Sequence, residues 1–362
     1  MSNIQHILKQ IRNLYPEFRQ YHWDNSGIQI QLKNQIHTIA LSLDITLETV
    51  EEAINKGAQI IISHHPLFFK PTKNLINHTN DGAIAIKCIQ NNISLYSMHT
   101  SYDNNPFGMG YFGLQAFGIK DIKPLKEIGS TTLAKVVVFC PNTHSDKLIE
   151  TLATAGAGSI GNYSHCHFTT EGCGSFMPLE GAKPYIGKIR QKESVNEQRI
   201  EMIFPIDKKG DIVQAIMRTH PYETPAYDIY KLENKIDSWG CGAIGKHPTS
   251  LNKQQLLTCI KSFFGDDPEK VYGNIDKPIQ KIGFVGGAGT DFIKDAVRAK
   301  CDIYITGEIR YHDLEYARNS NTAIIQMGHG VSERAPFYAC AKNIADATQC
   351  KVIICEDKFE FF

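Results

Sequence analysis

Short, almost continuously apolar segments alternate with amphipathic ones along the first third of the chain. The predicted elements there are strands at residues 37–44, 58–63 and 93–98 and helices at residues 46–57 and 81–92. Strands that are apolar on both faces are typical of a parallel sheet covered on both sides by helices. Thr46 has a side chain that is preferred at the N-cap, so the first of these helices is expected to begin there.

The last third of the chain repeats this alternation. Its predicted elements are strands at residues 281–287, 302–306 and 322–327 and helices at residues 290–300 and 308–320. In each third, one strand is followed by a histidine and then by an acid four residues later: His99 with Asp103, and His329 with Glu333. Any two strand–helix–strand units look alike, but this shared ending favours an internal duplication. We therefore expect an α/β fold with a pseudo-duplicated core of two βαβ halves and mostly parallel strands.

Residues 127–238 differ in character from the two thirds that flank them. Their pattern predicts the order strand, helix, strand, strand, helix, strand, with a glycine-containing hairpin at residues 162–178. This order is that of a small ferredoxin-like α+β domain, whose two ends lie close enough for insertion at a sheet edge. We therefore expect the core to occupy residues 1–126 and 239–362, with the inserted domain at 127–238.

The charge balance narrows the classes of partner. Among 362 residues, Lys plus Arg and Asp plus Glu both number 38, so net charge gives no long-range attraction to nucleic acid or an anionic membrane. No apolar run approaches the roughly 20 residues that span a bilayer. The first 16 residues have an amphipathic helical pattern rather than that of a signal peptide. We therefore expect a cytoplasmic protein with no membrane partner.

The ten cysteines indicate a reducing environment. None forms a Cys-x-x-Cys pair, and several lie within apolar runs. Buried, reduced thiols are therefore favoured over disulfides.

Histidines follow a strand directly at residues 64 and 65. His64 and His65 end the segment 58–63 and precede Pro66, which cannot donate to a strand ladder. Adjacent residues point to different sides, so this pair can reach two metal ions. Ligands of open α/β sheets gather outside the carboxyl ends of strands, which is where the pair is expected.

The two His-x₃-acid sequences extend this set. His99 with Asp103 and His329 with Glu333 also follow predicted strands, and they supply imidazole and carboxylate without thiolate. Such ligands suit Zn, Mn or Fe in catalytic sites better than structural zinc. Either acid could bridge two ions about 3.5–4 Å apart. The alternative is a set of unrelated surface histidines, against which stands the recurrence at three strand ends.

Four further features each have two interpretations. Asp24 and Asn25 either form a turn or orient metal ligands as a second shell, and Asp44 is either a second-shell acceptor or a helix cap. Glu308 is either a general acid or base beside the metals or a solvated residue at a helix start. Residues 286–290, Gly-Gly-Ala-Gly-Thr, either cradle a phosphate or form an ordinary turn between strand and helix.

The outer thirds carry five short motifs: W-D-N-x-G at 23–27, S-H-H-P at 63–66, H-T-x-x-D at 99–103, T-G-E at 306–308 and G-H-x-x-x-E at 328–333. Together they resemble the Nif-three-like family, whose members are also called GTP cyclohydrolase I type 2 homologs. The middle segment, with F-T-T-E-G-x-G-x-F at 168–176 and H-P-Y-E-x-P-A-Y-D at 220–228, is similar to an insertion of the longer members that is likened to PII and CutA domains.

The resemblance implies a dinuclear centre of two divalent ions per subunit, with the ligands His64, His65, Asp103, His329 and Glu333. His99 is not among these five, but its place in the repeat makes it a near-shell candidate. The resemblance also implies a homohexameric toroid with the metal sites facing an internal cavity. It leaves two functions open: hydrolysis of a nucleotide by metal-activated water, or a non-catalytic role in metal or nucleotide binding and regulation. The native metal and the substrate stay open as well.

Overall fold

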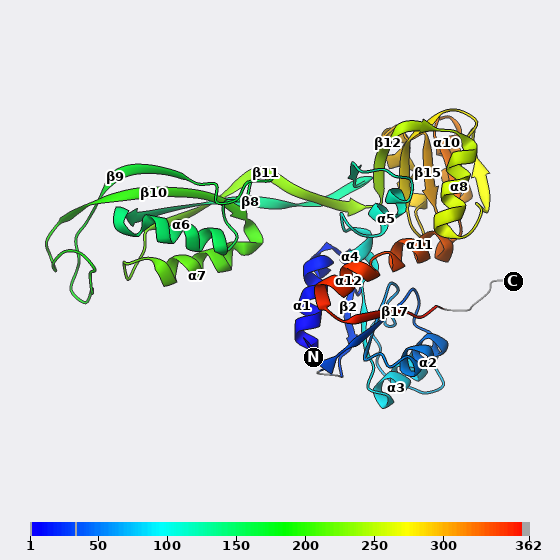
Figure 1. The fold of residues 1–362 in the computed structure, drawn as a ribbon, viewed down its shortest axis with the longest axis horizontal. Coiled ribbons are helices and arrows are strands. Elements are labelled where there is room, and N and C mark those ends of the chain that lie inside the picture. Colours follow the sequence, from blue (N-terminus) through cyan, green and yellow to red (C-terminus); the bar gives the residue numbers. More distant parts are fainter. Residues whose placement is uncertain (1, 33–34, 357–362) are drawn as a thin grey trace. The chain divides into compact units, whose positions relative to one another are not determined.

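A computed structural model describes residues 2–32 and 35–356 of the chain. The chain divides into two units, Met1–Gly129 together with Trp239–Phe362, and Ser130–Ser238 (Figure 1). The first unit contains both outer thirds of the sequence. Each unit is described by itself below.

The first half of the core forms a five-stranded sheet. Its strand order is β17 (Lys351–Ile354), β4 (Thr38–Ser42), β5 (Ile60–Ser63), β6 (Ser94–Ser97) and β2 (Gly27–Ile30). The first four of these are parallel to one another, and β2 is antiparallel to β6. Ser42, Ser63 and Ser97 are aligned in register, so β4, β5 and β6 end at the same level.

Helices α2 (Leu47–Asn55) and α3 (Asn80–Gln90) connect β4, β5 and β6. Thr46 is the N-cap of α2, as predicted, and forms a capping box with Thr49. The amphipathic N-terminal pattern forms α1 (Ile4–Leu14), which buries Ile4, Ile7, Leu8 and Ile11. A short ladder of β1 (Ser2–Asn3) and β3 (Gln35–Ile36) lies beside it.

The second half forms a six-stranded sheet. Its strand order is β13 (Lys270–Tyr272), β16 (Ala323–Gln326), β15 (Ile303–Thr306), β14 (Ile279–Val285), β12 (Ala243–Leu251) and β7 (Ile122–Lys123). The three central strands β14, β15 and β16 are parallel, while the flanking strands are antiparallel. Helices α8 (Lys253–Phe264), α9 (Ile293–Arg298) and α10 (Tyr311–Arg318) complete this half.

The two halves share one order of elements. An antiparallel edge strand is followed by three parallel strands joined by two helices, in β2–β4–α2–β5–α3–β6 and in β13–β14–α9–β15–α10–β16. The predicted α/β core with parallel strands is thus confirmed for the centres of both sheets. The antiparallel strands of the second sheet were not predicted, because β7 and β13 are only two and three residues long and β12, with the sequence AIGKHPTSL, lacks a continuous apolar run.

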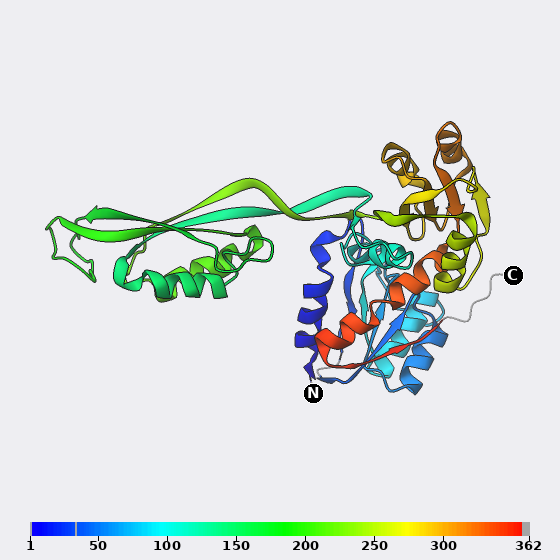
Figure 2. The same cartoon turned by 45° about the horizontal axis from the view of Figure 1, so that its top comes forward.

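The halves are also joined through their last elements. After β6 come α4 (His99–Asp103) and α5 (Met109–Gln115), and after β16 come α11 (His329–Tyr338) and α12 (Ala341–Thr348). Helix α11 packs on α5 and α8, and α12 packs on α1 (Figure 2). The chain then adds β17 to the sheet of the first half. One hydrophobic core therefore contains buried residues of both halves, such as Ile62, Tyr102, Ile305 and Phe337.

The second unit has the predicted order of elements, namely β8 (Lys126–Pro141), α6 (Ser145–Thr154), β9 (Phe168–Phe176), β10 (Glu193–Pro205), α7 (Lys209–Thr219) and β11 (Tyr227–Cys241). The sheet order β11-β8-β10-β9 is that of a ferredoxin-like fold. Its core packs Val136, Ile200 and Met202 of the sheet against Leu148 and Ile216 of the helices. The hairpin predicted at 162–178 is wrong, since this segment holds the single strand β9, which pairs with β10.

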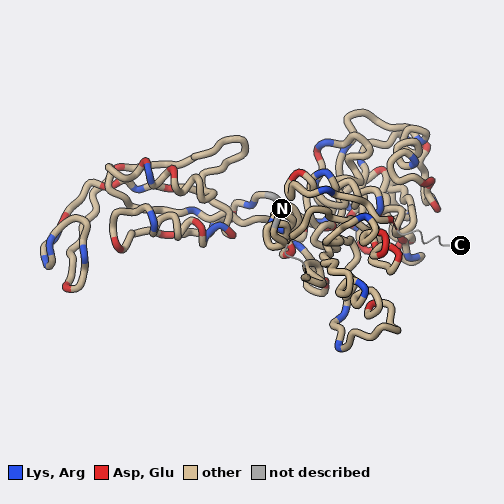
Figure 3. The backbone as a smooth tube through the Cα atoms, turned by 60° about the horizontal axis from the view of Figure 1, so that its bottom comes forward, with Lys and Arg blue, Asp and Glu red and all other residues tan. Residues whose placement is uncertain are grey.

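Charge and cysteine placement agree with the sequence-based expectations. Figure 3 shows acidic and basic residues interspersed along both units. All ten cysteines, which lie within the described ranges, are free thiols, and seven of them are buried like small apolar side chains. Among residues 2–32 and 35–356, no helix is both long and apolar enough to cross a membrane.

Candidate metal centre

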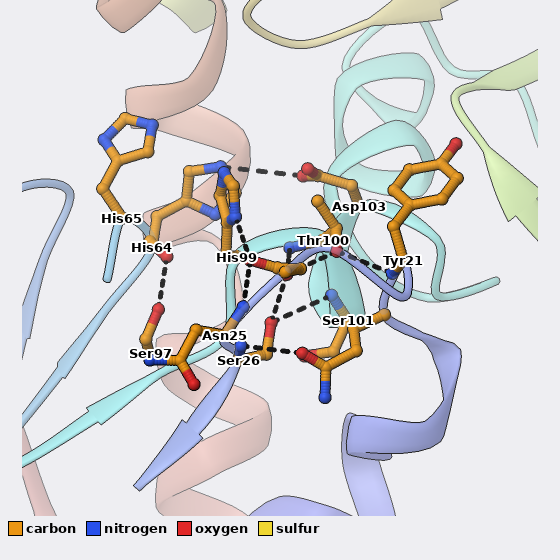
Figure 4. A network of polar contacts seen from close by, with 12 residues as sticks. Tyr21, Asn25, Ser26, His64, His65, Ser97, His99, Thr100, Ser101 and Asp103 are labelled. Carbon is orange, nitrogen blue, oxygen red and sulfur yellow. Dashed lines mark hydrogen bonds and ion pairs between the residues drawn. The ribbon is translucent and has the colours of Figure 1, made fainter. Parts of the chain in front are cut away.

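The candidate ligands lie at the carboxyl ends of strands from both halves. The hydrogen-bond ladder of the first sheet continues past the strands, because the His64 N–H donates to Ser42 and the His65 N–H donates to Leu43. The His99 N–H then donates to the carbonyl of His64. These backbone contacts fix three imidazoles side by side at one end of the sheet (Figure 4).

Glu333 of α11 faces three of the imidazoles. Its Oε1 lies 3.5 Å from His64 Nε2, and its Oε2 lies 3.3 Å from His65 Nε2 and 3.4 Å from His329 Nε2. Asp103 Oδ1 lies 3.7 Å from the same nitrogen of His64 (Figure 4). Two ligands of one tetrahedral zinc, each about 2.0–2.1 Å from the ion, are about 3.4 Å apart. The observed separations therefore match those of atoms that share an ion.

The potential ligand atoms fall into two overlapping groups. One contains His64, His65 and His99 and the other contains His65, His329 and Glu333, and within each group the atoms lie no more than 4.8 Å apart. His99, expected near the ligands, thus lies among them. The sequence-predicted residues of three strand ends are brought together at one place.

In three of these imidazoles, Nδ1 forms a hydrogen bond with a carboxylate. The pairs are Asp44 Oδ1 with His65 Nδ1 at 2.7 Å, Asp24 Oδ1 with His99 Nδ1 at 2.7 Å, and Glu308 Oε1 with His329 Nδ1 at 2.8 Å. A carboxylate at Nδ1 fixes the tautomer in which Nε2 carries a free lone pair for a metal. Asp44 is not the cap of α2, since the N-cap of that helix is Thr46.

Asp24 is anchored by more than its histidine. Its carboxylate is fully buried and accepts hydrogen bonds from the Thr100 N–H at 3.0 Å, the Thr100 hydroxyl and the Ser26 hydroxyl. Burial alone would raise its pKa, but His99 and these donors outweigh it and hold the pKa of Asp24 well below its usual range. Asn25 has a different role, because its Nδ2 donates to the Phe68 carbonyl at 2.6 Å and so joins two loops.

The electrostatics of the centre are compatible with a bound cation. Burial raises the pKa of Asp103 to about 7 and lowers that of His64. Burial also opposes the charge on Glu333, yet His64 and His65 keep its pKa below the usual range. Among the described residues, neither ring nitrogen of His64 nor Oε2 of Glu333 has a hydrogen-bond partner. Buried polar atoms are rarely left unpaired, and His64 Nε2 and Glu333 Oε2 are therefore available to a bound ion.

Gly287 closes the centre from the side of β14. A Cβ at this position would lie 2.1 Å from Glu333 Oε1 and 3.0 Å from His329 Nε2, and its φ of 62° also favours glycine. The Gly287 N–H donates to the Ser332 hydroxyl, so this donor is used inside the protein rather than offered to a phosphate. Sequence reasoning missed this role, although the repeat aligns Gly287 with Asp44 of the first half.

Comparisons with known proteins relate the whole chain to one family. The family model described as Duf34/NIF3 (NGG1p interacting factor 3) matches residues 2–358. A protein of Halalkalibacterium halodurans named "GTP cyclohydrolase 1 type 2 homolog" is 35% identical over 334 residues, covering 92% of this chain and 90% of the relative. A Bacillus subtilis protein of the same name is 31% identical over 328 residues, covering 90% and 88%.

A solved structure supports the same relationship. The crystal structure of a Bacillus cereus protein related to NIF3 has a TM-score of 0.88 and 34% sequence identity, and the match covers 99% of this chain and 97% of that one. Matches of this extent include the strand ends that carry the histidines and acids. The chain belongs to the Duf34/NIF3 family.

Proposed function

We propose that this chain holds two divalent metal ions and hydrolyses a nucleotide with their help. The observation that most directly supports this proposal is the position of Glu333. Its two carboxylate oxygens lie 3.3–3.5 Å from imidazole nitrogens of both halves. In this proposal Glu333 would serve both ions, because its two oxygens face imidazoles of both halves. His64, His99 and Asp103 would hold one ion, and His65 and His329 would hold the other.

The protein contributes orientation, and the ions contribute reactivity. A pair of divalent ions, when bound, lowers the pKa of water towards neutrality and stabilises developing negative charge. Asp24, Asp44 and Glu308 keep three ligand rings in the tautomer that binds metal. The side chain of Glu308 is 57% exposed, so it can also exchange protons with solvent beside His329.

The nucleotide substrate is supported by the name shared by the relatives, GTP cyclohydrolase 1 type 2 homolog. The test is to load the protein with Zn, Mn or Fe in turn and to incubate it with GTP and other nucleotides. Release of formate indicates opening of the guanine ring, and release of phosphate indicates phosphoester hydrolysis. We expect His65→Ala to lose metal and turnover together. Loss of metal with undiminished turnover would contradict hydrolysis by metal-activated water.

The second candidate is a protein that binds or transfers metal without catalysis. It is favoured by the exposure of the outer edge of the centre, where His329 is 39% exposed and its partner Glu308 is more so. Rapid transfer of both ions to a chelator, with no nucleotide turnover under any metal, would support this candidate over the hydrolase.

A further inference from the structure

Three aromatic side chains lie beside the candidate metal centre. The aromatic wall consists of Tyr21, Trp23 and Phe69. The Trp23 ring stacks on Tyr21 with centroids 5.4 Å apart and an interplanar angle of 12°, and its centroid lies 5.9 Å from that of Phe69. Trp23 and Phe69 lie 6.2 and 6.1 Å from the ring of His99, so the wall borders a candidate ligand directly.

The wall is exposed although it is firmly held. Trp23 is 50% exposed and Phe69 is 49% exposed. Trp23 immediately precedes Asp24, the buried carboxylate that orients His99, and Asn25 ties this loop to the carbonyl of Phe68. The network that positions the metal ligand therefore also fixes two large apolar rings in contact with solvent.

Such an arrangement is unusual for side chains that only pack. Large aromatic residues gain stability from burial, and exposed apolar clusters with a polar rim commonly mark binding sites. A stable protein–protein interface needs about 800 Å² per partner, more than three partly buried rings supply. Three rings beside the polar side chains of Asn25 and His99 suit one planar ring better than a protein surface.

We propose that the aromatic wall binds the base of a nucleotide by stacking, with the edge of the base directed to His99 and the metal centre. This inference rests on the proposed function and names the part of the substrate that is recognised. Stacking of a base on an aromatic side chain changes affinity by about 5- to 150-fold and tolerates different bases. A base held there has its ring next to the ions, which favours ring hydrolysis over attack on a distant phosphate.

The two tryptophans of the chain allow a direct test. Trp239 packs edge-on against Phe18, with the Arg19 guanidinium 5.3 Å from its ring. The Trp239→Phe variant keeps Trp23 as its sole tryptophan. We expect guanosine and GTP to quench its fluorescence saturably, while inorganic triphosphate and ribose 5-phosphate leave it unchanged.

Calorimetric titration of the full-length, metal-loaded protein provides the second measurement. We expect Trp23→Ala to weaken guanosine binding by about 5- to 150-fold, and Trp23→Phe to restore most of it. Phe107→Ala is the matched control, because Phe107 is 61% exposed and packs on Tyr111 instead of the centre. Its affinity for guanosine should be unchanged, as should the metal content of all three variants.

The outcomes separate this inference from the proposed function. Purine binding that depends on Trp23, without any turnover, keeps the wall and rejects the hydrolase. Turnover of a nucleotide with the same KM in wild type and in Trp23→Phe and Trp23→Ala rejects the wall and keeps the hydrolase. If Trp23→Ala instead changes the oligomeric state and leaves guanosine affinity intact, the wall is a contact between copies of the chain and the inference is wrong.

Discussion

The two halves of the core build one centre from the same scaffold with different residues. His99 and His329 each begin a helix after the third parallel strand, and each has its Nδ1 held by a carboxylate. Asp103 and Glu333 follow four residues later on these helices. At these positions the halves supply equivalent chemistry.

The second parallel strands differ. In the first half β5 is followed by His64 and His65, and at the matching positions β15 is followed by Gly307 and Glu308. The position that carries a candidate ligand in one half therefore carries, in the other, the carboxylate that supports His329. The shared backbone determines where a side chain lies at the end of the strand. The residue type determines whether that side chain is a candidate metal ligand or a partner that orients one.

The largest expected effect tests the bridge between the halves. Glu333→Gln keeps the shape of the side chain but replaces a buried carboxylate that faces three imidazoles. We expect both ions to be lost, with metal affinity reduced by more than about 100-fold, the upper end for merely supporting residues. Asp103→Asn, which alters only the first half, should lose one ion. Elemental analysis of purified protein measures the stoichiometry, and two ions retained in Glu333→Gln would refute the bridging role.

An intermediate effect compares the supporting carboxylates. Asp24→Asn and Glu308→Gln should each weaken metal binding by about 10- to 100-fold. Asp24 belongs at the upper end, because it is buried and also accepts from Thr100 and Ser26, whereas Glu308 is largely exposed. Competition with a chelator gives both affinities. An equal or larger loss in Glu308→Gln would show that burial does not set the strength of support.

The smallest effect concerns pH. Burial opposes the charge on His65, but Asp44 and Glu333 outweigh it and raise its pKa to about 10 in the absence of metal. A raised folded-state pKa gives stability that is complete below the unfolded value near 6.5 and is lost as the pH rises towards 10. The metal-free protein should therefore lose about 2 kcal/mol between pH 6.5 and 8. Urea titrations measure this loss, and His65→Gln should reduce it, leaving the smaller loss that comes from Asp103, whose pKa is raised to about 7.

Much of this centre can be predicted from sequence because its signals are local. The strands β4, β5 and β6 are short apolar runs, and His64 and His99 each follow such a run directly. Asp44 and Glu308 were recognised as polar residues near the site, but their partners depend on contacts between separate loops. The need for glycine at 287 was not recognised, since it arises from Glu333, a residue 46 positions away.

Strand pairing between distant segments could not be predicted from the sequence either. The sequence Lys351–Ile354 has strand character, but nothing in it specifies a place beside β4. The two halves also differ at Gly328. This glycine, with φ of 87°, adds one residue between the strand and the helix that carries His329. Local patterns therefore predict elements and ligand types, and tertiary packing decides neighbours.

The pairing of β17 with β4 has a consequence for the order in which the protein is made. A ribosome adds about 5–20 residues per second, and Glu333 follows Asp103 by 230 positions, so it is translated on the order of ten seconds or more later. Until then the nascent chain carries His64, His65, His99 and Asp103 without the acid that faces them and without the strand that flanks β4. If the chain holds metal ions as proposed, the complete centre can therefore be loaded only late in translation or after it.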